Sequence, residues 1–200
     1  MKLYYSPGVC SLASHIVLRE AELPFTPVRV NLHTHTFNGV DYYSVNARGY
    51  VPLLELDNGE RLSEGPAIMQ YVADRVPEKK LVPAWGTMER YRLVEWLAFI
   101  SSELHKNFGP LFNPVIPEDV KDHHRECVHD RFQWMEGQIS GRAYVMGDSY
   151  SVADAYLFVV ASWGRHVGLA LSDFKNMRAL VDRVAARAPV QEALRIEGLG

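Results

Sequence analysis

The distribution of proline divides this chain into two parts and constrains its fold more than any other feature. Prolines recur through the first 80 residues, among them Pro24, Pro27, Pro52, Pro66 and Pro77. From residue 87 to residue 200 the apolar residues instead repeat at helical spacing over long stretches, with proline mostly between them. Because proline ends regular elements, we expect short elements in the first part and long helices in the second.

The boundary between the two parts is predicted from a change in composition. Residues 77–86 read PEKKLVPAWG, which combines two prolines, a charged run and a glycine. This composition is typical of an ordered linker that crosses a domain surface. We therefore predict a first domain over 1–78, a linker over 79–86 and a second domain over 87–200.

The first part has the pattern of a β-α-β unit followed by a β-β-α unit. Asn58-Gly59 lies between two extended runs and tolerates the positive φ angles of a type I′ hairpin turn. A segment around 37–46 connects the two units. This order predicts an α/β domain with a four-stranded mixed sheet. The expected strands and helices are, in chain order, 1–5, 10–23, 27–32, the two runs within 51–63, and 65–76.

The second part is predicted to be all-helical. Ser151 and Asp154 have the spacing of a capping box and precede an apolar run typical of a buried helix. The expected helices cover 87–108, 118–139, the run after Ser151, 173–187 and 189–196. The first of them carries one apolar stripe made of Met88, Tyr91, Val94, Leu97, Ile100, Leu104 and Phe108.

Charge and composition exclude several classes of function. The chain has 21 Lys and Arg residues against 24 Asp and Glu residues, so a nucleic-acid partner has no electrostatic support. No apolar run approaches the roughly 20 residues of a membrane span, and the N-terminus lacks the pattern of a signal peptide. Cys10 and Cys127 are the two cysteines, which excludes a multi-disulfide scaffold and favours reduced thiols in the cytosol.

Cys10 is the first candidate for chemistry. It follows a predicted strand and Gly8, and it stands where the first predicted helix begins. Free backbone N–H groups and the helix dipole favour a thiolate there, the dipole by about 0.3 to 1 kcal/mol. Most free cysteines are small buried hydrophobes, but this position favours a function. The chain has no C-x-x-C pair, so a self-contained dithiol is excluded.

Two further pairs of residues lie where a small ligand would meet exposed backbone. Val51-Pro52 precedes a predicted strand, and a cis bond there would turn the Val51 backbone outward beside a thiol site. Glu64-Gly65 opens the next predicted helix, where the free N–H groups hold a carboxylate and Glu64 accepts an ammonium. Taken alone, both pairs also fit ordinary structural roles, a strand-initiating proline and a helix-stabilising acid.

A metal site is not predicted. His123 and Cys127 are four residues apart on a predicted helix and lie near His124 and His129. No second ligand pair with the spacing of a closed site accompanies them, and a solvated helix face rich in His is far commoner.

Four segments carry a resemblance to a known family. They read MKLYYSPGVCSLASHIVLREAELPF from residue 1, YVPLLELDNG from residue 50, LSEGPAIMQYVAD from residue 62 and SVADAYLF from residue 151. In this order and spacing the chain resembles the bacterial beta-class glutathione transferases over its full length, to the ending Glu197-Gly198-Leu199. The resemblance implies a thioredoxin-like N-terminal domain, an all-helical C-terminal domain and a cytosolic homodimer.

The same resemblance implies roles for individual residues. Cys10 matches the cysteine that contacts the glutathione sulfur or forms a mixed disulfide with it, and His105 matches a histidine of the cleft. Val51 would pair its backbone with the cysteinyl group of glutathione, with Pro52 cis. The expected glutathione-binding residues are Cys10, Ser11, His35, Val51, Pro52, Glu64, Gly65 and Lys106, and the electrophile cleft is expected to include Phe108, Phe112 and Trp163.

Two positions depart from the family pattern. His35 falls where many relatives carry a Lys near the glycyl carboxylate, so glutathione affinity is expected to be weaker and to depend on pH near 6.5. Ala98 replaces an Asn that reaches the glutathione of the partner subunit, which puts that contact in doubt.

The sequence therefore predicts a glutathione transferase that uses glutathione as co-substrate and conjugates it to small hydrophobic electrophiles. Thiol transfer and dehalogenation at the same cysteine stay open. Two other hypotheses also stay open: a non-catalytic interaction module of the same fold, and a ligandin-type protein that carries apolar compounds.

Overall fold

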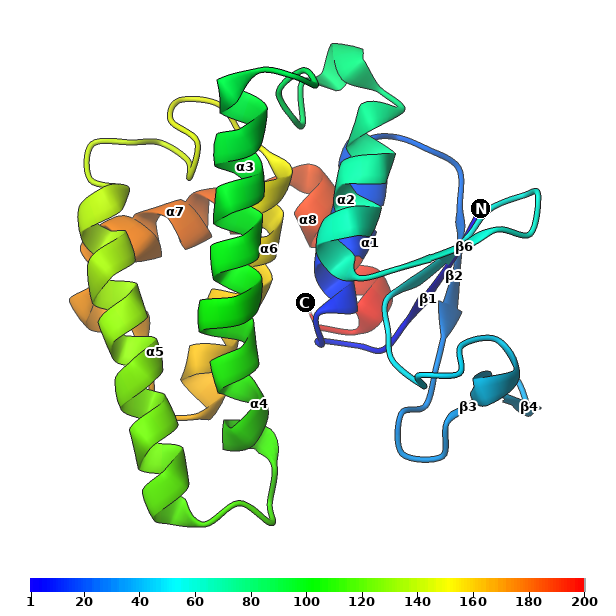
Figure 1. Ribbon diagram of the computed structural model, residues 1–200, viewed down its shortest axis with the longest axis horizontal. Coiled ribbons are helices and arrows are strands. Elements are labelled where there is room, and N and C mark those ends of the chain that lie inside the picture. Colours follow the sequence, from blue (N-terminus) through cyan, green and yellow to red (C-terminus); the bar gives the residue numbers. More distant parts are fainter. Residues whose placement is uncertain (200) are drawn as a thin grey trace. The chain divides into compact units, whose positions relative to one another are not determined.

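The computed structural model describes residues 1–199, and these form two compact units (Figure 1). The first unit comprises residues 1–82 and 186–199, and the second comprises residues 83–185. This division differs from the predicted domains at the C-terminus, because the last helix, α8 (Ala188–Glu197), packs in the first unit. Its helical period is visible in the sequence, but a period does not indicate which unit a helix packs against.

A mixed sheet forms the centre of the first unit. Strand β1 pairs in parallel with β2 and antiparallel with β5, and β5 pairs antiparallel with β6, which gives the order β2-β1-β5-β6. This arrangement confirms the predicted β-α-β and β-β-α units. The strands are β1 (Lys2–Tyr5), β2 (Thr26–Arg29), β5 (Leu53–Glu55) and β6 (Arg61–Ser63).

The turn between β5 and β6 is not the predicted type I′ turn. The N–H of Gly59 donates to the carbonyl of Leu56 at 3.0 Å, and Gly59 has φ 86°. A type I′ turn needs positive φ at both Asn58 and Gly59, but of these two described residues Gly59 alone has it. The loop is longer than two residues and needs one left-handed position. Asn58 instead stabilises the turn through its side chain, which accepts a hydrogen bond from the N–H of Glu60 at 3.0 Å.

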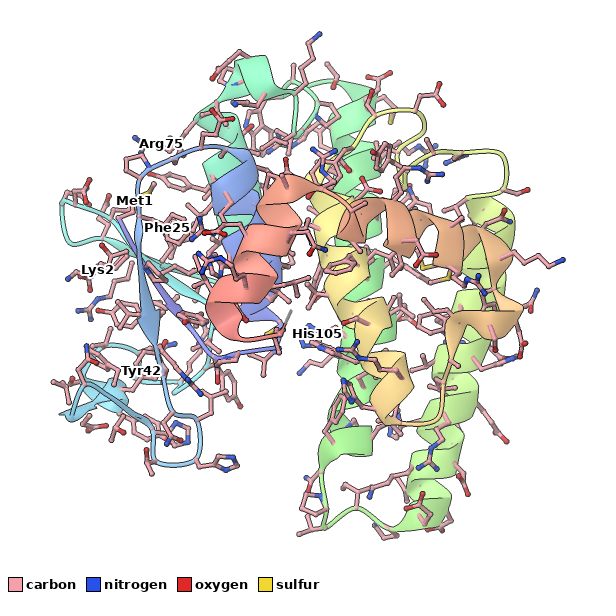
Figure 2. All side chains as sticks on the ribbon, turned by 180° about the vertical axis from the view of Figure 1, so that it is seen from behind. Met1, Lys2, Phe25, Tyr42, Arg75 and His105 are labelled. Atoms are coloured by element: carbon pink, nitrogen blue, oxygen red, sulfur yellow. The ribbon has the colours of Figure 1, made fainter. Side chains whose placement is uncertain are left out.

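Three helices pack together in the first unit. Helix α1 (Ser11–Glu20) contacts both α2 (Gly65–Asp74) and α8, as Figure 1 shows. The connection after β2 contains a small hairpin, β3 (Thr36–Phe37) and β4 (Val40–Asp41), where the sequence predicts only a connecting segment. Tyr42, labelled in Figure 2, follows this hairpin and is fully buried, with its OH donating to the carbonyl of Tyr50 at 2.9 Å.

The second unit is helical. The predicted helix over 87–108 is confirmed as one continuous helical stretch that runs on to residue 112. It consists of α3 (Met88–Phe99), a π-helical segment (Ile100–His105) and α4 (Lys106–Phe112). Helix α5 (Glu118–Gln138) runs beside α4, and α6 (Val152–Ser162) packs against α7 (Lys175–Ala185). Short 3-10 turns cover Pro77–Lys79 in the first unit, and Trp163–His166 and Leu171–Asp173 in the second.

The predicted apolar stripe of the first long helix is wrong over its first turns. Met88, Tyr91 and Val94 are exposed by 66%, 59% and 37%. The buried face of α3 is instead formed by Arg90, Leu93 and Leu97. The guanidinium of Arg90 lies 4.0 Å from the centre of the Trp85 ring, so a charged side chain takes an interior position that an apolar pattern cannot identify.

The capping box at the start of α6 is confirmed. Asp154 is fully buried, and its carboxylate accepts from the N–H of Ser151 at 2.8 Å and from the Ser151 hydroxyl at 2.9 Å. It also accepts from the N–H of Val145 at 2.7 Å, which ties the preceding loop to the helix. None of the helices within residues 1–199 has the length and apolar character needed to cross a membrane.

Candidate functional site

Cys10 stands directly before α1, as predicted, and its sulfur is oriented toward the next element of the site. Sγ donates a hydrogen bond to the carbonyl of Val51, with 3.3 Å between the atoms. The Val51-Pro52 peptide bond is cis, as the resemblance implied. The structure therefore brings the predicted cysteine and the predicted backbone pair into direct contact within the first unit.

The predicted thiolate at Cys10 is wrong for the free protein. Burial raises the pKa of Cys10 to about 11, and the Glu64 carboxylate adds to the increase. The backbone N–H groups of Cys10 and Ser11 oppose this change, as the helix start predicts, but they do not reverse it. Cys10 is therefore a neutral thiol at pH 7, and it acts as a hydrogen-bond donor.

The strand register places the second predicted pair beside the first. Leu53 in β5 lies opposite Ser63 in β6, so the residues before Leu53 lie next to those after Ser63. A Cβ atom at Gly65 would lie 3.8 Å from Pro52 Cγ, which is ordinary contact. Glu64-Gly65 thus opens α2 directly beside Val51-Pro52.

Glu64 has an unusual backbone for a residue with a side chain. Its φ is 68° and its ψ is 113°, outside the common regions for non-glycine residues. Its carbonyl accepts from the N–H groups of Ala67 and Ile68, both at 3.0 Å. Its side chain is 69% exposed and forms an ion pair with Arg48 at 3.0 Å. The carboxylate is therefore directed to the surface, and sequence reasoning did not identify its Arg48 partner.

Ser11 and Glu197 fix the loop that leads into Cys10. The Ser11 hydroxyl accepts from the N–H of Ser6 and donates to the Ser6 carbonyl, both at 3.1 Å. Glu197 of α8 accepts from the N–H of Gly8 at 3.0 Å and lies 2.8 Å from His15 Nδ1. Sequence reasoning also missed the roles of His15 and Glu197, because no local pattern links two residues that are 182 positions apart.

His35 lies in the connection between β2 and β3. Its φ is 51°, and its ring packs against Tyr43 with 4.6 Å between the ring centres. A Cβ atom at Gly49 would lie 3.0 Å from His35 Nδ1, so the ring packs closely on this backbone. The predicted contact of His35 with a glycyl carboxylate stays a prediction.

The second unit presents its own cluster around His105. This residue ends the π-helical segment, a type of distortion that is frequent at functional sites. Its Nδ1 lies 2.7 Å from the hydroxyl of Tyr156, and its ring lies edge-on to Trp163, with 5.0 Å between the ring centres. Figure 2 labels His105 in this helical unit. The sequence did not identify Tyr156, because it lies within an apolar run that reads as core.

The predicted cleft residues of the second unit cluster around the same tryptophan. Phe108 and Phe112 lie edge-on to Trp163, with ring centres at 5.7 Å and 6.2 Å. Phe108 is fully buried, whereas Phe112 is 49% exposed, and the electrophile contact that the resemblance implies for them stays a prediction. Lys106 and Ala98 are both exposed, and the roles that the resemblance assigns to these positions stay predictions.

No group of three or more His, Cys, Asp or Glu side chains in residues 1–199 is arranged to hold a metal ion. The predicted neighbours His123 and Cys127 do meet, with 3.6 Å between Nε2 and Sγ. Both cysteines are free. Two ligands from one exposed helix face do not make a closed metal site.

Comparison with known proteins identifies the family. Residues 9–75 match the family model described as glutathione S-transferase, N-terminal domain, and residues 99–188 match its C-terminal domain. The chain is 45% identical to the glutathione S-transferase GstA of Escherichia coli O157:H7 over 200 residues, which covers 100% of both proteins. The chain belongs to the glutathione S-transferase family. This membership confirms the resemblance seen in the sequence.

Solved structures of glutathione S-transferases have the same fold. A ternary complex of BphK, a bacterial glutathione S-transferase, is 52% identical to this chain with a TM-score of 0.98, and each chain is covered fully. A beta-class enzyme from Sphingomonas chungbukensis is 44% identical with a TM-score of 0.97, again with full coverage of both. These similarities confirm the predicted fold, a thioredoxin-like α/β domain joined to an all-helical domain.

Proposed function

We propose that this glutathione S-transferase conjugates the sulfur of glutathione to small hydrophobic electrophiles. The observation that carries the proposal is the Cys10–Val51 contact beside the start of α2. It places a thiol, the Val51 backbone and the start of a helix within one unit, and the free N–H groups of a helix start favour an anion. A sphingomonad glutathione S-transferase solved with glutathione is 42% identical to this chain over its full length, with a TM-score of 0.96, which supports glutathione as the co-substrate.

Each group of the first unit has a part in holding glutathione. The Val51 backbone pairs with the cysteinyl group as an added strand. When the cysteinyl N–H takes the Val51 carbonyl, the Cys10 S–H is released and donates instead to the glutathione sulfur. That hydrogen bond favours the glutathione thiolate over the thiol, and the thiolate is the nucleophile that attacks the electrophile. Gly65 N–H and the Glu64 carboxylate receive the γ-glutamyl end.

The second unit supplies the surface for the electrophile. Phe112 and Trp163 provide apolar contacts, and the imidazole of His105 is held by the Tyr156 hydroxyl. His105 either stabilises the thiolate or moves a proton during the reaction. Lys106 adds a positive charge next to it in the chain.

Calorimetric titration of glutathione into the reduced wild-type protein, Cys10→Ala and Cys10→Ser tests this proposal. We expect glutathione to bind to the wild type. In a separate activity assay, the rate of conjugation of 1-chloro-2,4-dinitrobenzene is expected to fall about two- to tenfold in Cys10→Ala, because one hydrogen bond to the thiolate is lost. Cys10→Ser keeps a donor and is expected to retain more activity. The absence of heat with millimolar glutathione would refute the proposal and favour a non-catalytic interaction module.

The intact mass of each protein after incubation with oxidised glutathione separates conjugation from thiol transfer. A mixed disulfide forms when the Cys10 thiolate attacks oxidised glutathione and releases one glutathione thiolate. The raised pKa of Cys10 makes this reaction slow at pH 7. A rapid adduct on the wild type, absent from Cys10→Ala, would favour thiol transfer as the main reaction.

We also propose that the protein is a homodimer that uses the exposed face of α3. Met88, Tyr91 and Val94 follow one another along that helix and leave an apolar stripe open to solvent. Light scattering after size-exclusion chromatography tests this assignment. Tyr91→Glu is expected to give monomers, and Tyr91→Phe is the matched control that keeps the apolar surface. A dimer that is unaffected by Tyr91→Glu would contradict the role of this face.

We propose the cytoplasm as the location of the protein. Both cysteines are free thiols, which fits a reducing compartment where glutathione is available as a co-substrate. Fractionation of cells that express the protein tests this location, and recovery in a membrane or secreted fraction would contradict it.

A further inference from the structure

The ion pair of Arg48 and Glu64 joins opposite charges at the start of α2. Arg48 Nη1 lies 3.0 Å from Glu64 Oε1, and both side chains are mostly exposed, by 62% and 69%. Exposed pairs of this kind contribute little to stability. A backbone such as that of Glu64, with φ 68°, costs more than such a pair returns. Stability alone therefore does not account for this arrangement.

The backbone of Arg48 is held in place by its own loop. Asn46 accepts from the N–H of Arg48 at 3.2 Å and donates through Nδ2 to the carbonyl of Tyr50 at 2.7 Å. The N–H of Gly49 donates to the carbonyl of Asn46 at 2.8 Å. These hydrogen bonds hold the backbone of the loop that carries Arg48, and so they limit where its guanidinium can lie. This loop comes just before the residue pair Val51-Pro52 in the chain.

The pair has the charge pattern that a zwitterion requires. The γ-glutamyl end of glutathione carries an ammonium and a carboxylate on the same carbon atom. Glu64 offers an acceptor for the ammonium, as proposed above. A guanidinium has five N–H donors in a planar fork, so Arg48 can contact Glu64 and a second carboxylate at the same time.

We infer that Arg48 is a glutathione-binding residue that receives the α-carboxylate of the γ-glutamyl group. Together Arg48 and Glu64 select ligands that carry both charges over ligands that lack either one. This inference deepens the proposed function and rests on it. The two are tested separately, because the proposed function concerns whether glutathione binds and the inference concerns which charge Arg48 contacts.

Three ligands titrated into the full-length reduced protein test this assignment. They are glutathione, 4-aminobutanoyl-Cys-Gly, which lacks the α-carboxylate, and glutaryl-Cys-Gly, which lacks the α-ammonium. Arg48→Gln is expected to weaken glutathione and glutaryl-Cys-Gly by about five- to tenfold. Its affinity for 4-aminobutanoyl-Cys-Gly is expected to stay the same or to increase, because Glu64 is freed for the ammonium.

Arg61→Gln is the matched control. Arg61 is also an exposed arginine of the first unit, paired with Glu55 at 3.1 Å, and its substitution changes the net charge equally. It is expected to leave all three affinities unchanged. Equal affinities of the wild type and Arg48→Gln for all three ligands would overturn the inference, as would an equal loss for all three. A wild type that binds none of them would instead overturn the proposed function.

Discussion

Substitution of Glu197 by Ala is expected to destabilise the first unit strongly, although this residue lies close to the C-terminus. The Glu197 side chain is fully buried and bonds two groups that are far away in the sequence. Gly8 N–H donates to it at 3.0 Å, and His15 Nδ1 lies 2.8 Å away. The other ring nitrogen of His15 accepts from Arg19 Nε at 3.0 Å, so His15 has a partner on both sides.

The expected magnitude follows from His15 Nδ1, the buried group that Glu197→Ala leaves without its carboxylate partner. A buried donor without a partner costs about 1–3 kcal/mol, so the free energy of unfolding is expected to fall by about 1–3 kcal/mol. For a chain of this size that corresponds to a decrease in Tm of about 2–12 °C. Glu197→Gln keeps one oxygen as an acceptor and is expected to lie between the wild type and Glu197→Ala.

Thermal and urea unfolding measure this effect, with Glu192→Ala as the matched control. Glu192 lies on the same helix, but its side chain is 41% exposed, and its ion pair with Arg195 at 2.7 Å is a surface contact. Its substitution is expected to cost less than about 1 kcal/mol. If Glu197→Ala unfolds within about 1 °C of Glu192→Ala, the reasoning from buried unpaired donors is refuted.

Three further outcomes are expected. Alkylation of Cys10 by iodoacetamide, followed by peptide mapping, is expected to be slow at pH 7 and to accelerate up to pH 10, because burial raises the pKa of Cys10 to about 11. An alkylation rate that reaches its plateau near pH 7 would contradict this. Burial raises the pKa of Asp154 from 3.8 to about 6, so the folded state binds a proton more tightly than the unfolded state does. The free energy of unfolding should therefore decrease by about 2 kcal/mol as the pH rises from about 4 to about 6. Asp154→Asn should lack this slope in urea titrations, and an unchanged slope would rule the assignment out. His35→Lys is expected to lower the Kd for glutathione about two- to fivefold by adding a permanent positive charge; an unchanged Kd in calorimetry would show that this position does not face the glycyl carboxylate.

The sequence identified those features of the fold that depend on local pattern. The four strands of the mixed sheet, the capping box of Asp154 and the pair Glu64-Gly65 at a helix start all follow from short-range signals, and the structure has each of them. The position of α8 does not follow from such a signal. It depends on contacts such as Arg187 with Glu20, at 2.6 Å between Nε and Oε1 and 167 residues apart, which no local pattern encodes.

The exposed face of α3 was misassigned for a related reason. A helical period marks which residues share a face, but it does not say whether another element of the same chain covers that face. Tyr91 and Met88 repeat at the spacing of a core stripe, yet Arg90 and Leu93 are buried. An apolar stripe that the folded chain leaves open is what a second subunit would cover, so this error of the sequence reading also motivates the proposed dimer.

Cys10 shows why a correctly located residue was assigned the wrong protonation state. The helix dipole favours a thiolate by about 0.3 to 1 kcal/mol, whereas the rise in pKa from 9.0 to about 11 corresponds to about 3 kcal/mol in the opposite direction. Desolvation therefore exceeds the dipole, and the Val51 carbonyl adds an acceptor that suits the neutral thiol. The Val51 carbonyl lies 41 positions from Cys10 in the chain, so this contact is absent from any local reading. Burial and this contact leave Cys10 as a proton donor in the free protein, which is the protonation state that the proposed hydrogen bond to a glutathione thiolate requires.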